Sequence, residues 1–188
     1  METKNRVTVV FSLAALTLFV PACRGKHGTE PVQNEESAPA PTVAAKPPVA
    51  SVLAMNDPQA ATQLITGFYA VEQNSWRWTA GRFSAVLAAP PGAERTGGTL
   101  SFGFTIPDAI FSRLGPLTLT AAAGGTVLRS ETYKAAGKYT FHADIPAALL
   151  ATGSVKVDFA LDKSVPPGTA GDQRELGIIA SSLGIAVK

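Results

Sequence analysis

Apolar and polar residues alternate along four stretches in the second half of the chain, residues 100–106, 117–121, 139–144 and 155–161. In the first of them Leu100, Phe102 and Phe104 are separated by Ser101 and Gly103. A period of two places every second side chain on the same face of a strand. Each stretch is therefore predicted to be a strand with one buried and one solvated face.

Four further stretches are candidate strands, residues 76–79, 82–88, 126–132 and 177–187. Turn signals such as Pro90-Pro91-Gly92 and Gly124-Gly125 separate the candidates at short intervals. Short helical turns are predicted in two connections, at residues 107–114 and 146–151. Many short strands at this spacing predict an all-β fold, an antiparallel β-sandwich of the jelly-roll or Ig-like kind, over residues 62–188.

Residues 1–22 have the three-part pattern of a secretory signal peptide. Lys4 and Arg6 form a basic start, residues 7–20 are mostly apolar, and the small residue Ala22 precedes Cys23. The apolar run is shorter than the roughly 20 residues that a membrane-spanning helix requires. Cleavage of this segment is therefore expected.

The sequence Val20-Pro21-Ala22-Cys23 resembles the lipobox of bacterial lipoproteins. This resemblance implies cleavage before Cys23, a lipid on its thiol, and attachment to a membrane of the cell envelope. Pro21 departs from the small or hydroxyl residue usual at its place, so an ordinary secretory signal with an incidental cysteine is the alternative. Arg24 follows the cysteine instead of Asp, which by resemblance to enterobacterial sorting implies the outer membrane.

Residues 23–61 differ in character from the rest of the chain. They are rich in proline and alanine and show no apolar periodicity. Such a segment cannot bury enough apolar surface to offset the entropy of ordering, so it is predicted to be a disordered tether. Within it, Asp57 and Pro58 are predicted to begin a short helix that extends to Ile65.

Composition excludes several classes of function. The 188 residues carry a formal net charge of only +2, without a basic field that would attract nucleic acid. The single cysteine, Cys23, excludes an internal disulfide and a cysteine-built zinc site, and the chain has only two histidines. Neither a metal nor a cofactor is therefore predicted.

No catalytic motif is present. Asp144, Asp158 and Asp162 lie on predicted strands, and paired carboxylates can hydrolyse glycosidic bonds. Single acids along strand faces are more simply explained as solvated residues, so the protein is predicted not to be an enzyme. A glycosidase would require two of these carboxylates in one cleft.

Both tryptophans of the chain flank Arg77 in the run Trp76-Arg77-Trp78. On a strand, the two indoles point to one face and Arg77 to the other. Coplanar exposed indoles are a common means of holding sugar rings, and neighbouring polar groups would bind the hydroxyls. The predicted ligand-binding residues are Tyr69, Glu72, Trp76, Arg77 and Trp78. The alternative is that both indoles fill the core.

A second polar cluster, Asp172, Arg174 and Glu175, precedes the last apolar stretch. Arg77 is predicted to pair with Asp172 or Glu175, and Arg174 with Glu72. These pairs would form a structural clasp between early and late strands, fixing register more than adding stability. The alternative is a polar ligand pocket.

Three motifs carry a family resemblance: Gly-Phe-Tyr-x-x-Glu at 67–72, Trp-Arg-Trp at 76–78 and Asp-x-Arg-x-Leu-Gly-Ile at 172–178. Residues 67–188 resemble β-sandwich accessory modules attached to glycosyltransferases and methyltransferases of surface-polysaccharide pathways. The resemblance implies a glycan-binding module without catalytic residues.

Two functions are consistent with these patterns. The first is a lipid-anchored envelope protein that displays a non-catalytic, saccharide-binding β-sandwich. The second is a structural or assembly lipoprotein that binds a protein partner in the envelope through a sheet edge or face.

Overall fold

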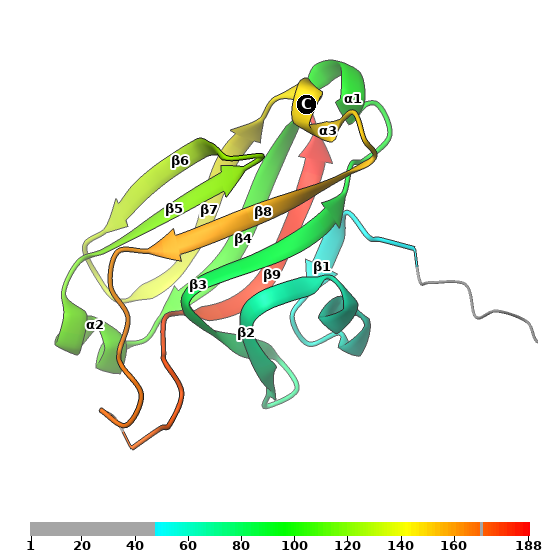
Figure 1. Cartoon of the computed structure of the whole chain (residues 1–188). Helices are drawn as coiled ribbons and strands as arrows, with labels where there is room; N and C mark the ends of the chain where they lie inside the picture. Colours follow the sequence, from blue (N-terminus) through cyan, green and yellow to red (C-terminus); the bar gives the residue numbers. More distant parts are fainter. Residues whose placement is uncertain (1–47, 170) are drawn as a thin grey trace, which may run out of the picture. The chain divides into compact units, whose positions relative to one another are not determined.

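The computed structural model describes residues 48–169 and 171–188, which form an all-β unit. The predicted signal peptide and Cys23 lie outside the described residues, as does the tether up to residue 47. The described part contains nine strands, and every pairing between them is antiparallel (Figure 1). The predicted antiparallel, all-β fold is therefore confirmed.

The strand order along the sheet is β6-β5-β8-β3-β9-β4-β7, with β1 beside β9 and β2 beside β3. The strands are β1 (Val52–Ala54), β2 (Leu64–Glu72), β3 (Trp76–Ala88), β4 (Gly98–Ile106), β5 (Leu117–Ala123), β6 (Thr126–Tyr133), β7 (Gly137–Ile145), β8 (Ser154–Leu161) and β9 (Ile179–Val187).

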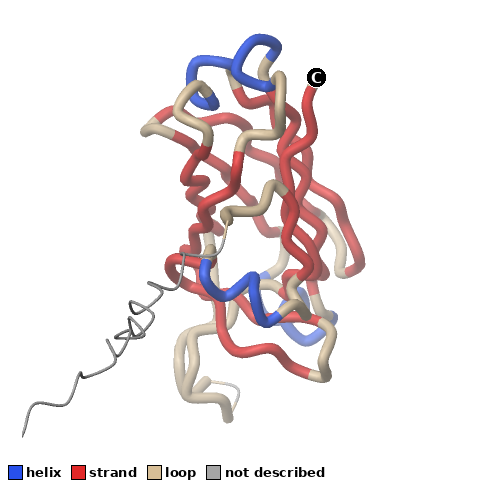
Figure 2. Tube along the Cα trace, turned by 90° about the vertical axis from the view of Figure 1, so that its right-hand side faces the viewer, coloured by secondary structure: helices blue, strands red, loops and turns tan. Residues whose placement is uncertain are grey.

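The sheet folds over on itself into two layers. Strands β6, β5, β8, β3 and β2 form one layer, and β7, β4, β9 and β1 form the other (Figure 1). Figure 2 shows the layers from the side as two walls of strands. The layers join at β3, which pairs with β9 at Arg77 and Trp78 and with β8 from Arg82 onward.

The core lies between the two layers and is rich in phenylalanine. Phe83 of β3 stacks on Phe159 of β8 with ring centroids 5.0 Å apart, and both contact Phe102 of the opposite layer. Residues 100, 102, 104 and 106 of β4 are all buried. This is the face that the sequence alternation predicts, because each strand turns every second side chain toward the other layer.

Strand β3 has 13 residues and replaces the two shorter strands predicted at 76–79 and 82–88. Ala80 and Gly81, which have small side chains, lie between the two predicted strands. The backbone nevertheless continues through both residues, because β2 pairs along one edge of β3 while β9 and β8 pair in succession along the other.

The predicted tether extends too far. Residues 48–61 belong to the folded unit, because β1 pairs with β9 and the side chains of Leu53 and Met55 are buried. Gln63 fixes the same segment by hydrogen bonds from its side chain to the backbone of Ala50 and Val86. A three-residue strand between prolines is too short to show a periodicity in sequence.

Short helices occupy the connections between strands. The two predicted helical turns correspond to α2 (Asp108–Leu114) and α3 (Ala147–Leu150), whereas α1 (Ala93–Thr96) was not predicted. Asp57 does cap a helix, the 3-10 helix η1 (Pro58–Thr62), which ends before the predicted Ile65. Among the helices of residues 48–169 and 171–188, none combines the length and the hydropathy that a membrane-spanning helix requires.

Candidate functional site

The hairpin of β2 and β3 sets the positions of the aromatic run. Gln73 and Asn74 have positive φ values of 49° and 51°, and the amide of Ser75 donates a hydrogen bond to the carbonyl of Glu72. This tight turn places Glu72 directly opposite Trp76. Since directly opposed residues of an antiparallel pair share a face, Glu72 and Trp76 lie side by side.

The two indoles alternate along β3 with the buried Arg77 and Thr79, and Trp78 also packs against the edge of the core. Arg77 and Thr79 are buried, whereas Trp76 and Trp78 are half-buried. The indole rings contact each other at a centroid distance of 5.9 Å with an interplanar angle of 86°. Neither indole is fully buried as a core plug, although Trp78 packs against the core, and the expectation that the two rings are coplanar is wrong. One indole presents its edge to the face of the other.

Arg77 does not make the predicted ion pair with Asp172 or Glu175. Its Nε donates to the carbonyl oxygen of Met55 at 3.0 Å, and its Nη1 donates to that of Tyr69 at 3.1 Å. Burial lowers the pKa of the guanidinium below its ordinary value. Arg77 therefore joins β2 and the segment after β1 from inside the fold, and it does not belong to the outer surface that carries the tryptophans.

Arg174 does contact Glu72, as predicted. Its Nη1 lies 2.7 Å from Oε1 of Glu72, and its Nη2 lies 2.7 Å from Oδ2 of Asp172. Hydrogen bonds from the side chain and the backbone amide of Arg174 lower the pKa of Asp172 to about 2. The bonds to both carboxylates raise the pKa of Arg174. The loop before β9 is thus linked to the end of β2.

Tyr69 connects this ion-paired cluster to the chain around Glu175. Its hydroxyl donates to the carbonyl oxygen of Glu175 at 2.8 Å, and the guanidinium of Arg174 lies over its ring at 5.1 Å. Burial and the negative charge of Glu175 raise the pKa of Tyr69. The carboxylate of Glu175 itself accepts a hydrogen bond from Ser164. Glu175 is thus held without an arginine partner.

Four of the five predicted ligand-binding residues are brought together. Trp78 contacts Trp76, Trp76 faces Glu72, and Arg174 bonds to Glu72 and covers Tyr69. We name the surface formed by these four residues together with Asp172 and Arg174 the tryptophan–arginine face. It comprises Tyr69, Glu72, Trp76, Trp78, Asp172 and Arg174. Its apolar part is a perpendicular indole pair, and its polar part is a planar, ion-paired guanidinium that is already fixed by its partners.

The three aspartates considered for glycosidase chemistry are not joined in one site. Asp144 on β7 pairs with Lys188 at 2.9 Å, and Asp158 on β8 pairs with Lys156. Asp162 accepts a hydrogen bond from the amide of Thr118. Each carboxylate has a separate partner on its own part of the sheet. Within residues 48–169 and 171–188, no three His, Cys, Asp or Glu residues are grouped as a metal site would require.

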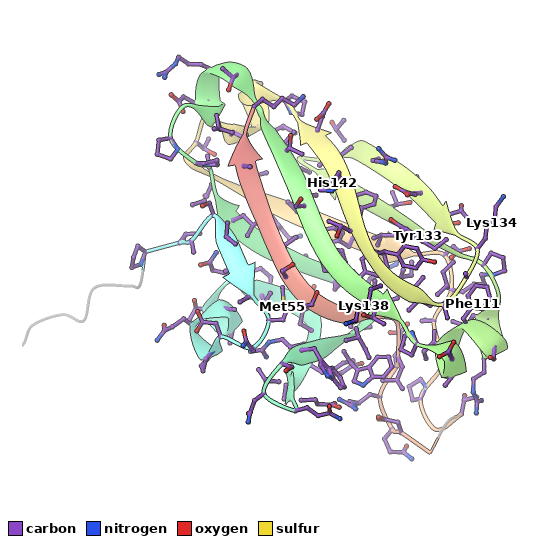
Figure 3. All side chains as sticks on the ribbon, turned by 180° about the vertical axis from the view of Figure 1, so that it is seen from behind. Met55, Phe111, Tyr133, Lys134, Lys138 and His142 are labelled. Atoms are coloured by element: carbon purple, nitrogen blue, oxygen red, sulfur yellow. The ribbon has the colours of Figure 1, made fainter. Side chains whose placement is uncertain are left out.

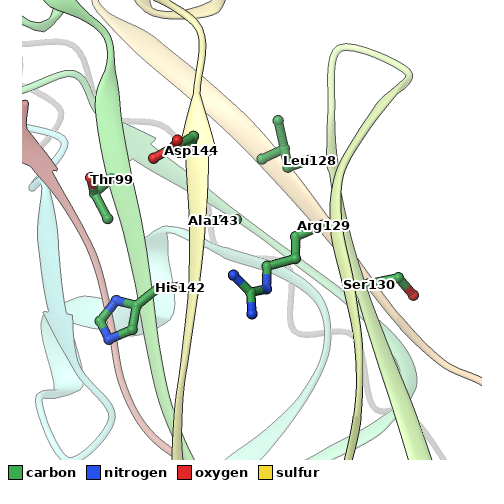
Figure 4. Close-up of a pocket in the computed structure, with 7 residues that line it drawn as sticks. All are labelled: Thr99, Leu128, Arg129, Ser130, His142, Ala143 and Asp144. Carbon is green, nitrogen blue, oxygen red and sulfur yellow. The ribbon is translucent and has the colours of Figure 1, made fainter.

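A cleft between β6 and β7 was not predicted from the sequence. It has a volume of about 510 Å³ and lies where the two ends of the strand order face each other (Figure 4). It is lined by Thr99, Leu128, Arg129, Ser130, His142, Ala143 and Asp144. Consecutive strands with a short connection usually pair, so the sequence contained no signal that these two remain apart.

Comparisons with known proteins do not identify a family. No protein-family model matches the chain, and no curated protein matches it. The resemblance to polysaccharide-pathway accessory modules therefore stays a prediction based on the three motifs.

Proposed function

We propose that the protein is a lipid-anchored component of the cell envelope whose β-domain binds a saccharide, without catalysis, on the tryptophan–arginine face. The observation that carries the proposal is the position of two half-buried indoles that contact each other, with Trp76 directly opposite Glu72, whose carboxylate belongs to the ion-paired cluster around Arg174. Indole rings offer apolar area to the C–H face of a sugar, and fixed charged groups bind hydroxyls with little loss of side-chain entropy.

The perpendicular arrangement of the indoles determines how a sugar would bind. Since the rings of Trp76 and Trp78 meet at 86°, they form a corner and not a flat platform. One sugar ring would stack on a single indole and contact the second at its edge. Arg174 retains N–H groups beyond those that bond Glu72 and Asp172, because a guanidinium has five donors. Arg174 would supply these donors to adjacent hydroxyls.

Binding to an array of cell-envelope oligosaccharides tests this assignment. The full chain is expected to bind a subset of glycans. Trp76→Ala and Trp78→Ala should each weaken binding about tenfold or more, as removal of an aromatic anchor does. Val187→Ala is the matched control, because Val187 is an exposed apolar residue at the other end of the unit. Glycan binding that persists unchanged in both tryptophan variants would reject the site.

The anchor requires a separate experiment because Cys23 lies outside the described residues. Cells expressing the protein are fed an alkyne fatty acid and the protein is probed for the label. Wild-type protein is expected to be labelled and to sediment with membranes, and Cys23→Ser should abolish both. One acyl chain holds a protein only weakly, so firm membrane association implies more than one chain at this residue. An unlabelled wild-type protein would disprove lipidation.

A further inference from the structure

Strands β6 and β7 are neighbours in the chain but do not pair with each other. The three residues from Lys134 to Ala136 join them. Loops of this length usually connect the two strands of a hairpin. Here β6 pairs with β5 and β7 pairs with β4, and the other edge of each strand has no strand partner in the described part of the chain. Two sheet edges thus face each other across a seam.

The seam is closed at one end and open at the other. Near the connecting loop, the ring of Tyr133 on β6 contacts that of Tyr139 on β7 at a centroid distance of 4.5 Å. Further along, the strands border the cleft of about 510 Å³. Figure 3 labels Tyr133, the last residue of β6, toward the closed end of the seam, and His142 of β7 toward the open end. The gap therefore has the shape of a wedge.

Charged side chains occupy the inner face of β6 where a closed sheet would carry apolar ones. Arg129 is opposite Ala121 and Glu131 is opposite Leu119, and both partners on β5 are fully buried. Arg129 and Glu131 form an ion pair at 2.9 Å. The Arg129 side chain extends from β6 toward β7 (Figure 4). Inward-facing charges keep an open edge hydrated and prevent indiscriminate pairing with other edges.

A second, independent observation is a buried polar group at the closed end of the seam, the hydroxyl of Tyr133. The residue is only 5% exposed, and its hydroxyl has no hydrogen-bond partner in the described residues. Burial, with the nearby charge of Glu131, raises the pKa of this hydroxyl. Buried hydroxyl groups in folded proteins nearly always have a partner. A segment that extends from the cleft toward the connecting loop, and separates the rings of Tyr133 and Tyr139, would bring a carbonyl oxygen to accept a hydrogen bond from it.

We propose that the seam is a binding site for an extended polypeptide segment of a partner protein, which inserts as a strand between β6 and β7. Two facing rows of backbone donors and acceptors match a partner with the same repeat of roughly 3.3 Å per residue, which an extended peptide has and a sugar chain lacks. The inward side chains of the segment are small or apolar, because they meet Leu128 and Ala143.

Charge further defines the segment. Arg129, which borders the cleft, is paired with Glu131, but the exposed Lys134 and Lys138 flank the connecting loop and add positive charge. Asp144, the acid at the open end, is paired with Lys188. An acidic segment is therefore favoured over a basic one. This site lies on different strands from the tryptophan–arginine face, so it does not rest on the proposed saccharide binding.

Selection from a phage library of ten-residue peptides against the full chain tests the proposal. Selected peptides should be acidic with alternating apolar residues. A synthetic copy should protect backbone amides of β6 and β7 from hydrogen exchange, and those of the edge strands β1 and β2 should exchange as before. Ala143→Phe, which fills the cleft, should weaken binding about tenfold or more, whereas Thr140→Phe on the exposed side of β7 should not.

Arg129→Glu is a second variant, because it leaves the packed core intact and reverses the charge that faces an acidic peptide. It should also weaken binding, while Arg95→Glu on α1 should have no effect. Failure to select peptides, or affinities unchanged in both seam variants, would overturn the proposal. Self-association through β6 would overturn it as well. The proposal would also be overturned if the amides of β6 and β7 that border the seam were protected from hydrogen exchange in the full chain but not in a chain that begins at Pro48. The seam would then be occupied by the protein's own residues before Pro48 and not by a partner.

Discussion

The guanidinium of Arg174 lies 2.7 Å from the carboxylate of Glu72, although 102 positions separate the two residues. The same guanidinium bonds to Asp172, two positions away. This contact fastens the loop that precedes β9 to the last residue of β2, and it holds the polar half of the tryptophan–arginine face beside Trp76. The side chains of Arg174, Glu72 and Asp172 are 30–34% exposed, so the ion pair orders this surface more than it stabilises the fold.

The ion pair predicts a measurable pH dependence. Arg174 lowers the pKa of Asp172 from its ordinary value of 3.8 to about 2. The ion pair therefore contributes its full stabilisation to the folded state above pH 3.8, and this contribution is lost as the pH falls through about 2. In Arg174→Gln, NMR titration of the Asp172 carboxyl should give a midpoint shifted back toward 3.8. Arg95→Gln, which breaks an exposed pair with Glu94, should leave it unchanged. A midpoint near 3.8 in the wild-type protein would contradict the described pair.

Arg77→Ala is expected to destabilise the unit by about 3 kcal/mol, because it leaves the carbonyl oxygens of Met55 and Tyr69 without their donor inside the fold. Urea unfolding measures the loss. The control is Arg82→Ala on the same strand, whose exposed side chain should contribute less than about 0.5 kcal/mol. Equal stabilities of the two variants would show that Arg77 is solvated.

Gly67→Ala should be among the most destabilising small substitutions. Gly67 has a φ of +72°, and a Cβ there would lie 2.1 Å from the carbonyl oxygen of Arg82. Backbone strain and the clash together predict a loss of about 3 kcal/mol or more in the free energy of unfolding. Gly115→Ala separates the two effects, because Gly115 has a φ of +70° and open space around it.

For Gly115→Ala only the strain applies, so the expected cost is about 1–2 kcal/mol. If both alanine variants unfold at the same urea concentration, the close approach of β2 to β3 at Gly67 is incorrect.

Gln63→Leu tests whether residues 48–61 belong to the folded unit. The side-chain amide of Gln63 bonds to the N–H and carbonyl of Ala50 and to the carbonyl of Val86, at 2.7, 2.9 and 2.8 Å. Loss of these bonds should cost about 2–3 kcal/mol. It should also speed hydrogen exchange in β1. Gln59→Leu, at an exposed position in η1, is the control. Rapid hydrogen exchange of the β1 amides already in the wild-type protein would show that residues 48–61 belong to the tether, as the sequence predicts.

The sequence predicted the parts of the fold in which one strand face is buried. Strands β4, β5, β7 and β8 alternate clearly, since their inner residues meet the opposite layer. Strand β2 was not predicted as a separate strand, because three register shifts against β3 disturb its burial pattern. The pairing of Arg174 with Glu72 could be predicted because charged side chains carry a complementary signal. The partners of Arg77 could not, because backbone carbonyls occur at every residue.

The open seam is the clearest case of a feature without a local signal. Nothing in residues 126–145 indicates whether β6 and β7 pair with each other or with β5 and β4. That choice depends on how far the whole sheet curls before its ends meet, which is a property of all the strands together.

The emission of Trp76 and Trp78 tests the central claim most directly, because the chain contains no other tryptophan. A glycan that binds the full chain is titrated while fluorescence and acrylamide quenching are recorded. We predict a shift of the emission to shorter wavelength and reduced quenching, both saturating with binding, and unchanged behaviour in Val187→Ala. Emission and quenching that stay constant while the glycan saturates the protein would contradict binding at the tryptophan–arginine face.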